Sequence, residues 1–265
     1  MRPATGDLVV SGVHVRFGGV RALDGVELAV PRGTIYGVIG PNGAGKTTLL
    51  NCVSRFQPYA AGSVHYRGRD LGPLRPHHLA SLGIARTFQH VNLFRSRSIL
   101  DNLLLGMHTR LGNPLATALA LPAARRREQS MWARARELAA LCGLSVGAAE
   151  QGRPVSELPF GDQKRVELAR ALAAEPTLLL LDEPVAGCNE EETRELAGII
   201  RRAARELDAT VVVVEHDMAL VSAICDEVAV LHFGRRLVVG APEAILNHPL
   251  VVEAYLGAGV SHAEA

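Results

Sequence analysis

The sequence predicts an α/β fold in which helices cover a mostly parallel sheet, with a β-rich segment ahead of the sheet and a helical insertion within it. Three observations predict this. The apolar run Ile35–Ile39 leads directly into a glycine-rich loop. Two more apolar runs, 178–181 and 211–214, alternate with helical stripes. Between His90 and Glu157 the chain is rich in Ala, Leu and Arg. Continuous apolar runs are typical of strands buried on both faces of a parallel sheet, and strands alternate with helices around such sheets.

Taken in order, the first segment reads as short strands over 8–10, 13–17 and 26–30. Gly12, the pair Gly18-Gly19 and the triplet 31–33 separate these runs, as turns do. After the run Ile35–Ile39, a helix is expected to begin near Lys46.

In the middle region, apolar residues at helical spacing predict a helical subdomain. They are Met131, Ala135, Leu138 and Leu141. We interpret the basic cluster Arg125–Arg127 nearby as a solvated helix face. A second stripe, from Val166 to Ala173, predicts a helix after Gly161, and the tail from Pro242 reads as short helices.

Length, charge and cysteine content limit the possible functions. A chain of 265 residues fits one core with an inserted subdomain. Its 28 basic and 27 acidic residues give a net charge of +1, so no broad attraction to nucleic acid or anionic lipid is expected. The four scattered cysteines show no metal-ligand spacing, which predicts reduced and mostly buried thiols. No apolar run approaches the roughly 20 residues that span a bilayer, and no signal peptide is evident, so any membrane role would need a partner.

The glycine-rich loop carries the strongest chemical signal. Residues 40–47 match the pattern G-x-x-x-x-G-K-[ST]: Gly40, Pro41, Asn42, Gly43, Ala44, Gly45, Lys46 and Thr47. Glycines let the backbone curl so that successive N–H groups face phosphate oxygens, and the helix that follows presents its positive end to the same anion. Lys46 would reach the β- and γ-phosphates, and Thr47 would offer its hydroxyl to Mg²⁺. The alternative, a chance glycine turn, does not explain the strand before the loop and the helix after it.

Two later strands end in acidic residues. The run 178–181 is followed by Asp182 and Glu183, and we expect Asp182 near Mg²⁺ and Glu183 as the general base for an attacking water. The run 211–214 is followed by Glu215, His216 and Asp217. Parallel strands bring their carboxyl ends to one crevice, so His216 could contact the γ-phosphate, although a lone His after a strand is more often structural.

The order of these features resembles the ATPase subunits of ABC transporters over essentially the whole chain. The series comprises Phe17, the loop 40–48, Thr87-Phe88-Gln89, a helical stretch, the segment 158–163, the strand leading to Asp182-Glu183, and Glu215-His216-Asp217. The resemblance implies a P-loop NTPase core of the RecA type, an N-terminal antiparallel β subdomain and an inserted helical subdomain. We place the core at 1–89 and 166–265 and the helical signature subdomain at 90–165. ATP and Mg²⁺ are the implied cofactors.

The resemblance also assigns individual roles. Phe17 resembles the aromatic residue that stacks on adenine, and Thr48 a hydroxyl that contacts phosphate. Gln89 resembles the glutamine that touches Mg²⁺ and water and couples the nucleotide to the membrane partner, which makes Thr47, Gln89 and Asp182 the expected metal set. His216 resembles the switch histidine.

The signature segment departs from the family pattern L-S-G-G-Q. It reads Leu158, Pro159, Phe160, Gly161, Asp162. Pro159 has neither a hydroxyl nor an N–H to offer a γ-phosphate, and Phe160 would crowd the backbone. Cys188-Asn189 replaces the usual Leu-Asp pair further on. In this family two ATPase subunits clamp ATP between the loop of one and the signature of the other. We therefore hypothesise unequal sites, in which the site that receives Pro159-Phe160 binds ATP more than it hydrolyses it.

These departures are similar to one importer subgroup, for branched-chain and other hydrophobic amino acids, and within it to the first of two different ATPase subunits. Close relatives serve urea and short-chain amide uptake, which remains open as an alternative. The implied partners are a second ATPase subunit (as a heterodimer or homodimer), two permease subunits and, indirectly, a solute-binding protein, with no nucleic acid. The implied location is the cytoplasmic face of the inner or plasma membrane, where the permeases hold the subunit.

Three other functional classes fit less well. An ABC ATPase acting on DNA or the ribosome would carry long coiled coils or two nucleotide domains, whereas this chain has one phosphate loop and no sustained heptads. A small-molecule kinase has no use for the series of Gln89, the signature and His216. A purely regulatory nucleotide binder has no need of a general base such as Glu183.

Overall fold

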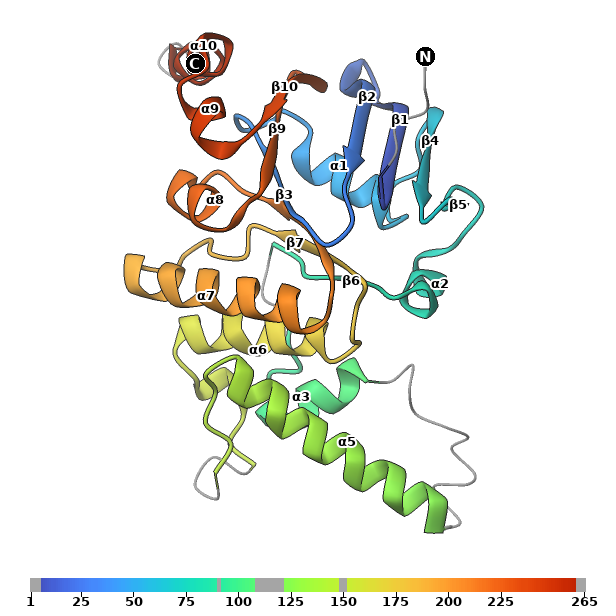
Figure 1. The fold of residues 1–265 in the computed structure, drawn as a ribbon, viewed down its shortest axis with the longest axis vertical. Helices are drawn as coiled ribbons and strands as arrows, with labels where there is room; N and C mark the ends of the chain where they lie inside the picture. Colours follow the sequence, from blue (N-terminus) through green and yellow to red (C-terminus); the bar gives the residue numbers. More distant parts are fainter. Residues whose placement is uncertain (1–5, 90–91, 108–121, 148–151, 261–265) are drawn as a thin grey trace.

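The described residues form two sheets and a group of helices (Figure 1). The structure, a computed structural model, describes residues 6–89, 92–107, 122–147 and 152–260. The smaller sheet has four strands in the order β2-β1-β4-β5. Its members are β1 (Leu8–Phe17), β2 (Val20–Val30), β4 (Ala61–Tyr66) and β5 (Arg69–Asp70). Every neighbouring pair is antiparallel, which confirms the antiparallel β segment that the resemblance implied.

One prediction about this sheet is wrong. The runs 8–10 and 13–17 are not separate strands but belong to the single strand β1. Gly12 lies at a φ of 56° within it, and the pairing with β2 shifts register between Val10 and Val13. A glycine in the left-handed region lets one strand absorb an extra residue as a bulge, so the chain bends there without turning back.

The larger sheet has six strands in the order β10-β9-β3-β8-β7-β6. They are β3 (Ile35–Ile39), β6 (Ile84–Arg86), β7 (Leu178–Asp182), β8 (Thr210–Val214), β9 (Glu227–His232) and β10 (Arg235–Gly240). All neighbouring pairs are parallel except β9 with the edge strand β10. This confirms the mostly parallel sheet, although the sequence did not predict β6, β9 or β10.

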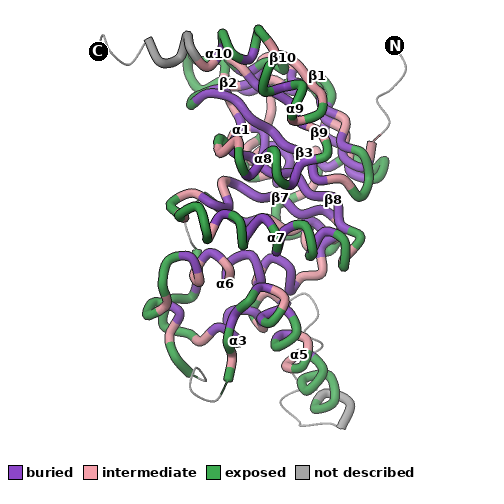
Figure 2. The backbone as a smooth tube through the Cα atoms, turned by 60° about the vertical axis from the view of Figure 1, so that its left-hand side comes forward, coloured by how far each residue is buried: buried purple, intermediate pink, exposed green. Residues whose placement is uncertain are grey.

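The larger sheet is buried on both faces, because alternate side chains enter two different cores. Leu179 and Val213 pack into a core shared with the helices of the second half of the chain. Leu180 and Val214 pack instead with α1 (Lys46–Val53) and with the antiparallel sheet. The buried tube of β3, β7 and β8 runs through the centre of the molecule (Figure 2). Burial on both faces of the sheet explains why the sequences of β3, β7 and β8 are uninterrupted apolar runs.

Helices lie around and below this sheet (Figure 1). The short ones are α2 (Pro76–Leu79), the 3₁₀ turns Ala80–Leu82 and Val155–Glu157, α8 (Met218–Ile224) and α9 (Pro242–Leu246). The longer ones are α3 (Ile99–Gly106), α5 (Pro122–Leu141), α6 (Phe160–Leu172), α7 (Glu190–Glu206) and α10 (Pro249–Val260). Helices α9 and α10 confirm the helical tail. No helix in the described ranges combines the length and apolar character needed to cross a membrane.

Helices α3, α5 and α6 form the part of the molecule below the sheet in Figure 1. The predicted stripe lies on α5, where Ala135 and Leu138 are fully buried, and Arg125–Arg127 are exposed on the same helix. Pro122 begins α5, a position where its missing N–H costs nothing. We assign no function to the segment 114–127, of which residues 114–121 lie outside the described residues. The domain boundaries near 90 and 165 stay a prediction.

Cys52, Cys142 and Cys225 are buried free thiols, and Cys188 is half-buried. Burial raises the pKa of Cys52, Cys142 and Cys225 to about 12 each, so these three thiols stay protonated and unreactive at neutral pH.

Candidate functional site

Four neighbouring parallel strands end at one edge of the larger sheet, and each delivers part of the candidate site. The glycine-rich loop follows β3, Asp182 and Glu183 end β7, Glu215 and His216 follow β8, and Gln89 lies three residues beyond β6. Because β3, β8, β7 and β6 are adjacent and parallel, their carboxyl ends meet in one crevice. The structure therefore brings together segments that lie more than 100 residues apart.

The loop 40–45 requires glycine at specific positions. A side chain on Gly40 would collide with the carbonyl oxygen of Leu231, and one on Gly45 would lie 2.5 Å from the carbonyl oxygen of Ala22. Gly43, at a φ of 79°, faces open space instead. The loop is thus packed tightly against the protein at both ends and exposed at Asn42 and Gly43. Helix α1 begins at Lys46, directly at the end of the loop, so its free N–H groups lie where the loop opens.

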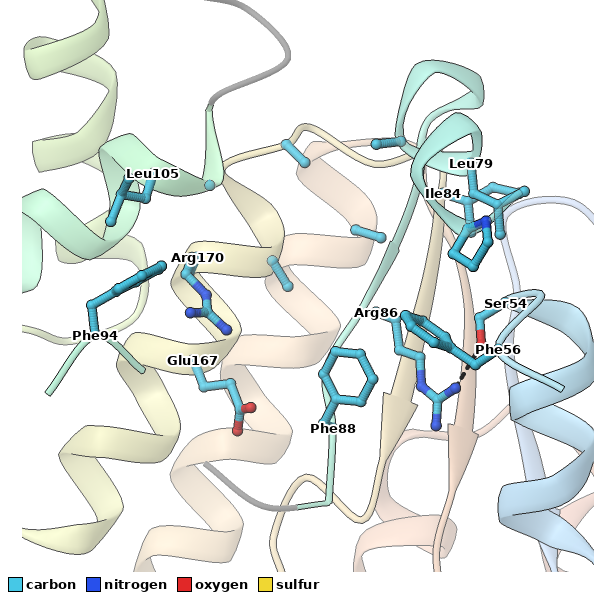
Figure 3. Close-up of a pocket in the computed structure, with 16 residues that line it drawn as sticks. Ser54, Phe56, Leu79, Ile84, Arg86, Phe88, Phe94, Leu105, Glu167 and Arg170 are labelled. Carbon is cyan, nitrogen blue, oxygen red and sulfur yellow. Dashed lines mark hydrogen bonds between the residues drawn. The ribbon is translucent and has the colours of Figure 1, made fainter. Parts of the chain in front are cut away.

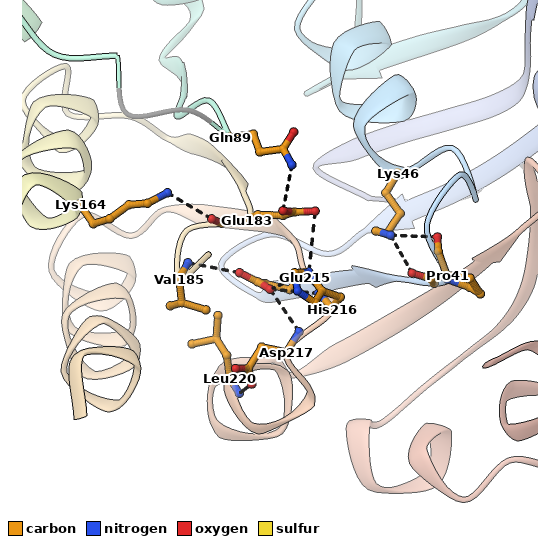
Figure 4. Close-up of polar contacts among 11 residues, drawn as sticks. Pro41, Lys46, Gln89, Lys164, Glu183, Val185, Glu215, His216, Asp217 and Leu220 are labelled. Atoms are coloured by element: carbon orange, nitrogen blue, oxygen red, sulfur yellow. Dashed lines mark hydrogen bonds and ion pairs between the residues drawn. The ribbon is translucent and has the colours of Figure 1, made fainter. Parts of the chain in front are cut away.

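Lys46 is almost fully buried within this loop. Its Nζ donates hydrogen bonds to the carbonyl oxygens of Gly40 at 2.7 Å and Pro41 at 3.1 Å (Figure 4). Burial lowers the pKa of Lys46, and the carboxylates of Glu183, Glu215 and Asp182 oppose that change. An ammonium held beside a curled backbone and an N-terminal helix end suits a phosphate chain, whose charge would offset the burial.

Asp182 is the deepest acid of the site, at 1% relative exposure. Its Oδ2 accepts a 2.8 Å hydrogen bond from Arg86, while its Oδ1 is buried and has no hydrogen-bond partner among the described residues. Burial raises the pKa of the Asp182 carboxyl. The charge and hydrogen bond of Arg86 oppose this rise, and the nearby Thr47 hydroxyl opposes it to a smaller extent. A buried carboxylate oxygen without a partner, next to a threonine hydroxyl, fits the oxygen ligand set of a hard cation such as Mg²⁺.

Glu183 lies between two other predicted residues. Its Oε2 accepts a 3.1 Å hydrogen bond from Gln89 Nε2, and its Oε1 lies 3.8 Å from His216 Nδ1 (Figure 4). The Glu183 side chain is 14% exposed, whereas that of His216 is 56% exposed. Glu183 has a φ of 48°, in the left-handed region that a non-glycine residue seldom adopts and that recurs at functional sites. The carboxylate of Glu183 is therefore held at the mouth of the crevice with Gln89 on one side and His216 on the other.

Glu215 is a site residue to which the sequence interpretation assigned no role. It is fully buried, and its carboxylate accepts hydrogen bonds from the backbone N–H groups of Val185 (3.3 Å), His216 (3.0 Å) and Asp217 (3.2 Å). Glu215 thereby ties the segment after Glu183 to the segment that carries His216. A charged residue directly after a fully apolar run was the available signal, because buried acids need partners.

Two predicted nucleotide contacts lie beside the loop. Phe17 is half-exposed at the β1–β2 turn, where it pairs with Val20 of β2. Ala22, two residues further along β2, lies against Gly45 of the loop. Thr48 lies in the first turn of α1 and is half-buried. Their roles stay predictions.

The signature residues lie at the N-terminus of α6. Pro159 is the residue before the helix, Phe160 is 46% exposed, and Gly161 is buried against the Glu192 side chain. Leu158 and Asp162 are half-buried. The helix runs from Phe160 to Leu172 and so begins before Gly161, not after it as the sequence predicts, because Pro159 can precede a helix and leaves Phe160 free to enter its first turn.

Comparison with known proteins identifies the family. Residues 23–186 match the sequence profile described as ABC transporter, and residues 235–261 match one described as branched-chain amino acid ATP-binding cassette transporter. The chain is 41% identical over 251 residues to the high-affinity branched-chain amino acid transport ATP-binding protein LivG of Salmonella typhimurium, covering 94% of this chain and 97% of that protein. It is 41% identical over 252 residues to the protein BraF of Pseudomonas aeruginosa, which has the same description, with the same coverage.

Among solved structures, the ADP conformation of MJ1267, an ATP-binding cassette of an ABC transporter, is similar with a TM-score of 0.79 and 29% identity. The match covers 94% of this chain and 98% of that one. A nucleotide-free ATP-binding cassette from an ABC transporter matches with a TM-score of 0.77 and 29% identity, over 94% and 98% of the two chains. From the near full-length identity, the matching fold and the phosphate loop with its acids, we conclude that this chain belongs to the ABC transporter family, as an ATP-binding subunit with ATPase activity.

Proposed function

We propose that this subunit drives the import of branched-chain or other hydrophobic amino acids. The observation that carries the proposal is the 41% identity to LivG and BraF over 94% of the chain, both described as branched-chain amino acid transport proteins. The match of residues 235–261 to the branched-chain amino acid profile supports it independently, because the ABC transporter profile matches only residues 23–186.

Within the site, we assign phosphate binding to the loop 40–48, with Lys46 as its charged contact. Thr47, Asp182 and Gln89 would hold Mg²⁺, which when bound neutralises charge on the phosphate oxygens. Glu183 orients and deprotonates the attacking water, and His216, 3.8 Å from Glu183, contacts the terminal phosphate. Phe17 stacks on the adenine from the neighbouring β1–β2 turn.

We further propose that the subunit works with a second ATPase subunit and two permeases, which hold it at the cytoplasmic face of the membrane and take their solute from a binding protein. We place the nucleotide-binding core at 1–89 and 166–265 and the helical signature subdomain at 90–165. ATP binding favours the closed ATPase dimer and hydrolysis releases it, so the nucleotide shifts a two-state equilibrium.

The substrate class is tested by uptake. The subunit, its partner ATPase, the permeases and the binding protein are reconstituted in proteoliposomes with ATP inside, and uptake of labelled leucine, urea and acetamide is measured. We expect leucine uptake that needs ATP and that excess unlabelled valine or isoleucine suppresses. Uptake of urea or acetamide without leucine uptake would contradict the amino-acid proposal and favour the related importer class.

Inequality of the two ATP sites is a separate prediction. Pro159 and Phe160 lie at the exposed end of α6, where a phosphate bound by the partner would meet them. Pro159 has neither the hydroxyl of the usual serine nor an N–H to donate, and the Phe160 side chain would crowd the approach. We expect Glu183→Gln in this chain to abolish most ATPase activity of the purified pair, and the matching change in the partner to have a much smaller effect. Equal losses from the two changes would refute the asymmetry.

A further inference from the structure

We propose that Arg86 is a positioning residue that holds the Asp182 carboxylate in the orientation that binds Mg²⁺. Arg86 would thereby control the contribution of Mg²⁺ to nucleotide binding. The inference rests on the proposed metal role of Asp182. It concerns a residue in none of the sequence motifs, at the end of β6 and three residues before Gln89.

Every nitrogen of the Arg86 guanidinium has a partner. NH2 donates to Asp182 Oδ2 at 2.8 Å, and Nε donates to the backbone oxygen of Thr87 at 3.3 Å. NH1 donates to Asn51 Oδ1 at 2.7 Å and to Ser54 Oγ at 2.6 Å. Asn51 lies in α1 and Ser54 directly follows it, so the guanidinium joins the helix of the phosphate loop to the acid at the end of β7.

The geometry divides the Asp182 carboxylate between two tasks. Arg86 occupies only Oδ2, while Oδ1 is buried and has no hydrogen-bond partner in the part of the chain that the structure describes. The terminal torsion of an aspartate is broad, so without a fixed partner the carboxylate could rotate. A rigid planar guanidinium, anchored at its other end, removes that freedom and leaves one defined oxygen for a cation. Thr87 restrains the backbone of Asp182 rather than its carboxylate, since the Asp182 N–H donates to Thr87 Oγ1 at 3.3 Å.

This ion pair is buried, and two aromatic rings pack beside it. The Arg86 side chain is 7% exposed and that of Asp182 is 1% exposed. The Arg86 guanidinium lies 5.0 Å from the ring centroid of Phe88 and 5.8 Å from that of Phe56, and the two rings contact each other edge to face. These rings and Arg86 line a cavity of about 540 Å³ (Figure 3). In such a low-dielectric setting the pairing of Arg86 with Asp182 is strong, and a change at Arg86 would act directly on the acid.

The test compares the affinity of a non-hydrolysable ATP analogue in Mg²⁺ and in EDTA, by calorimetric titration of the full chain. In the wild type we expect Mg²⁺ to tighten binding. We call the ratio of the affinity in Mg²⁺ to the affinity in EDTA the Mg²⁺ gain. In Arg86→Met the Mg²⁺ gain should be about tenfold smaller, which is the effect typical for loss of a residue that orients a metal ligand, while the affinity in EDTA stays unchanged. Arg86→Lys keeps the charge but cannot reach Asp182, Asn51 and Ser54 together, so it should recover only part of the gain.

Arg170→Met is the matched control, since Arg170 lines the same cavity from α6 and should leave the Mg²⁺ gain intact. If the Arg86 variants do not fold, as thermal unfolding would show, the double variant Asn51→Ala/Ser54→Ala decides, because it removes the anchors and keeps the ion pair. An unchanged Mg²⁺ gain in whichever variant folds would overturn the role of Arg86. A wild type without any Mg²⁺ gain would instead overturn the proposed metal site itself.

Discussion

Glu183→Gln is expected to lower the ATPase turnover number about 100-fold or more while ATP binding persists. A positioned general base contributes about 10²–10⁴-fold, and glutamine cannot accept the proton of the attacking water. The structure supports this choice of base: Glu183 is held by Gln89 Nε2 at 3.1 Å and lies at the mouth of the crevice beside His216. Glutamine is nearly isosteric, so the fold and the contact with Gln89 should survive.

The measurement is steady-state ATP hydrolysis by the purified transporter complex, with ATP affinity titrated in parallel. Glu206→Gln provides the matched control, because Glu206 is exposed at the end of α7, just before β8 begins, whereas the site lies where β8 ends. Its turnover should equal that of the wild type. Hydrolysis at the wild-type rate in Glu183→Gln would remove Glu183 from the catalytic role, whatever the affinity.

Lys46→Ala is expected to weaken ATP binding about 10- to 100-fold. A hydrogen bond to a charged group contributes about 1.5–3 kcal/mol, and the alanine variant loses the charged contact to the phosphates altogether. The stability of the free protein should fall much less. The variant loses the hydrogen bonds from Lys46 Nζ to the carbonyl oxygens of Gly40 and Pro41, but it also loses a buried ammonium whose charged form burial disfavours, as the lowered pKa of Lys46 indicates.

Calorimetric titration with Mg-ATP and thermal unfolding without nucleotide separate these two effects. The chain contains only one other lysine, Lys164, which is also buried and whose Nζ lies 3.5 Å from the backbone oxygen of Glu183. Lys164→Ala therefore controls for the loss of a buried ammonium, and we expect it to keep the wild-type ATP affinity. A Lys46→Ala protein that binds Mg-ATP as tightly as the wild type would contradict the assigned role of the loop.

Local features of the chain were enough to predict the fold class and the importance of Asp182, which ends β7, and of Glu183, which follows it. Ile35–Ile39, 178–181 and 211–214 are continuous apolar runs because both faces of the central sheet are buried, and this signal is local. The phosphate loop is equally local, since its glycines serve backbone geometry within eight residues. The edge strand β10 and the short strand β6 were not predicted, because half-buried or three-residue strands carry little periodicity.

Which residues meet in the site depends instead on how the folded chain orders its strands. Gln89 and His216 reach Glu183 because β6, β7 and β8 are neighbours in the sheet, an order that no periodicity in the chain encodes. The roles of Arg86 and Glu215 likewise depend on contacts that form only in the folded chain. Each is a charged residue whose importance follows from burial and from partners on other elements, Asp182 for Arg86 and the N–H groups after β7 and β8 for Glu215. Backbone preferences act between residues close in sequence, whereas the partners of a buried charge are set by packing across the whole chain.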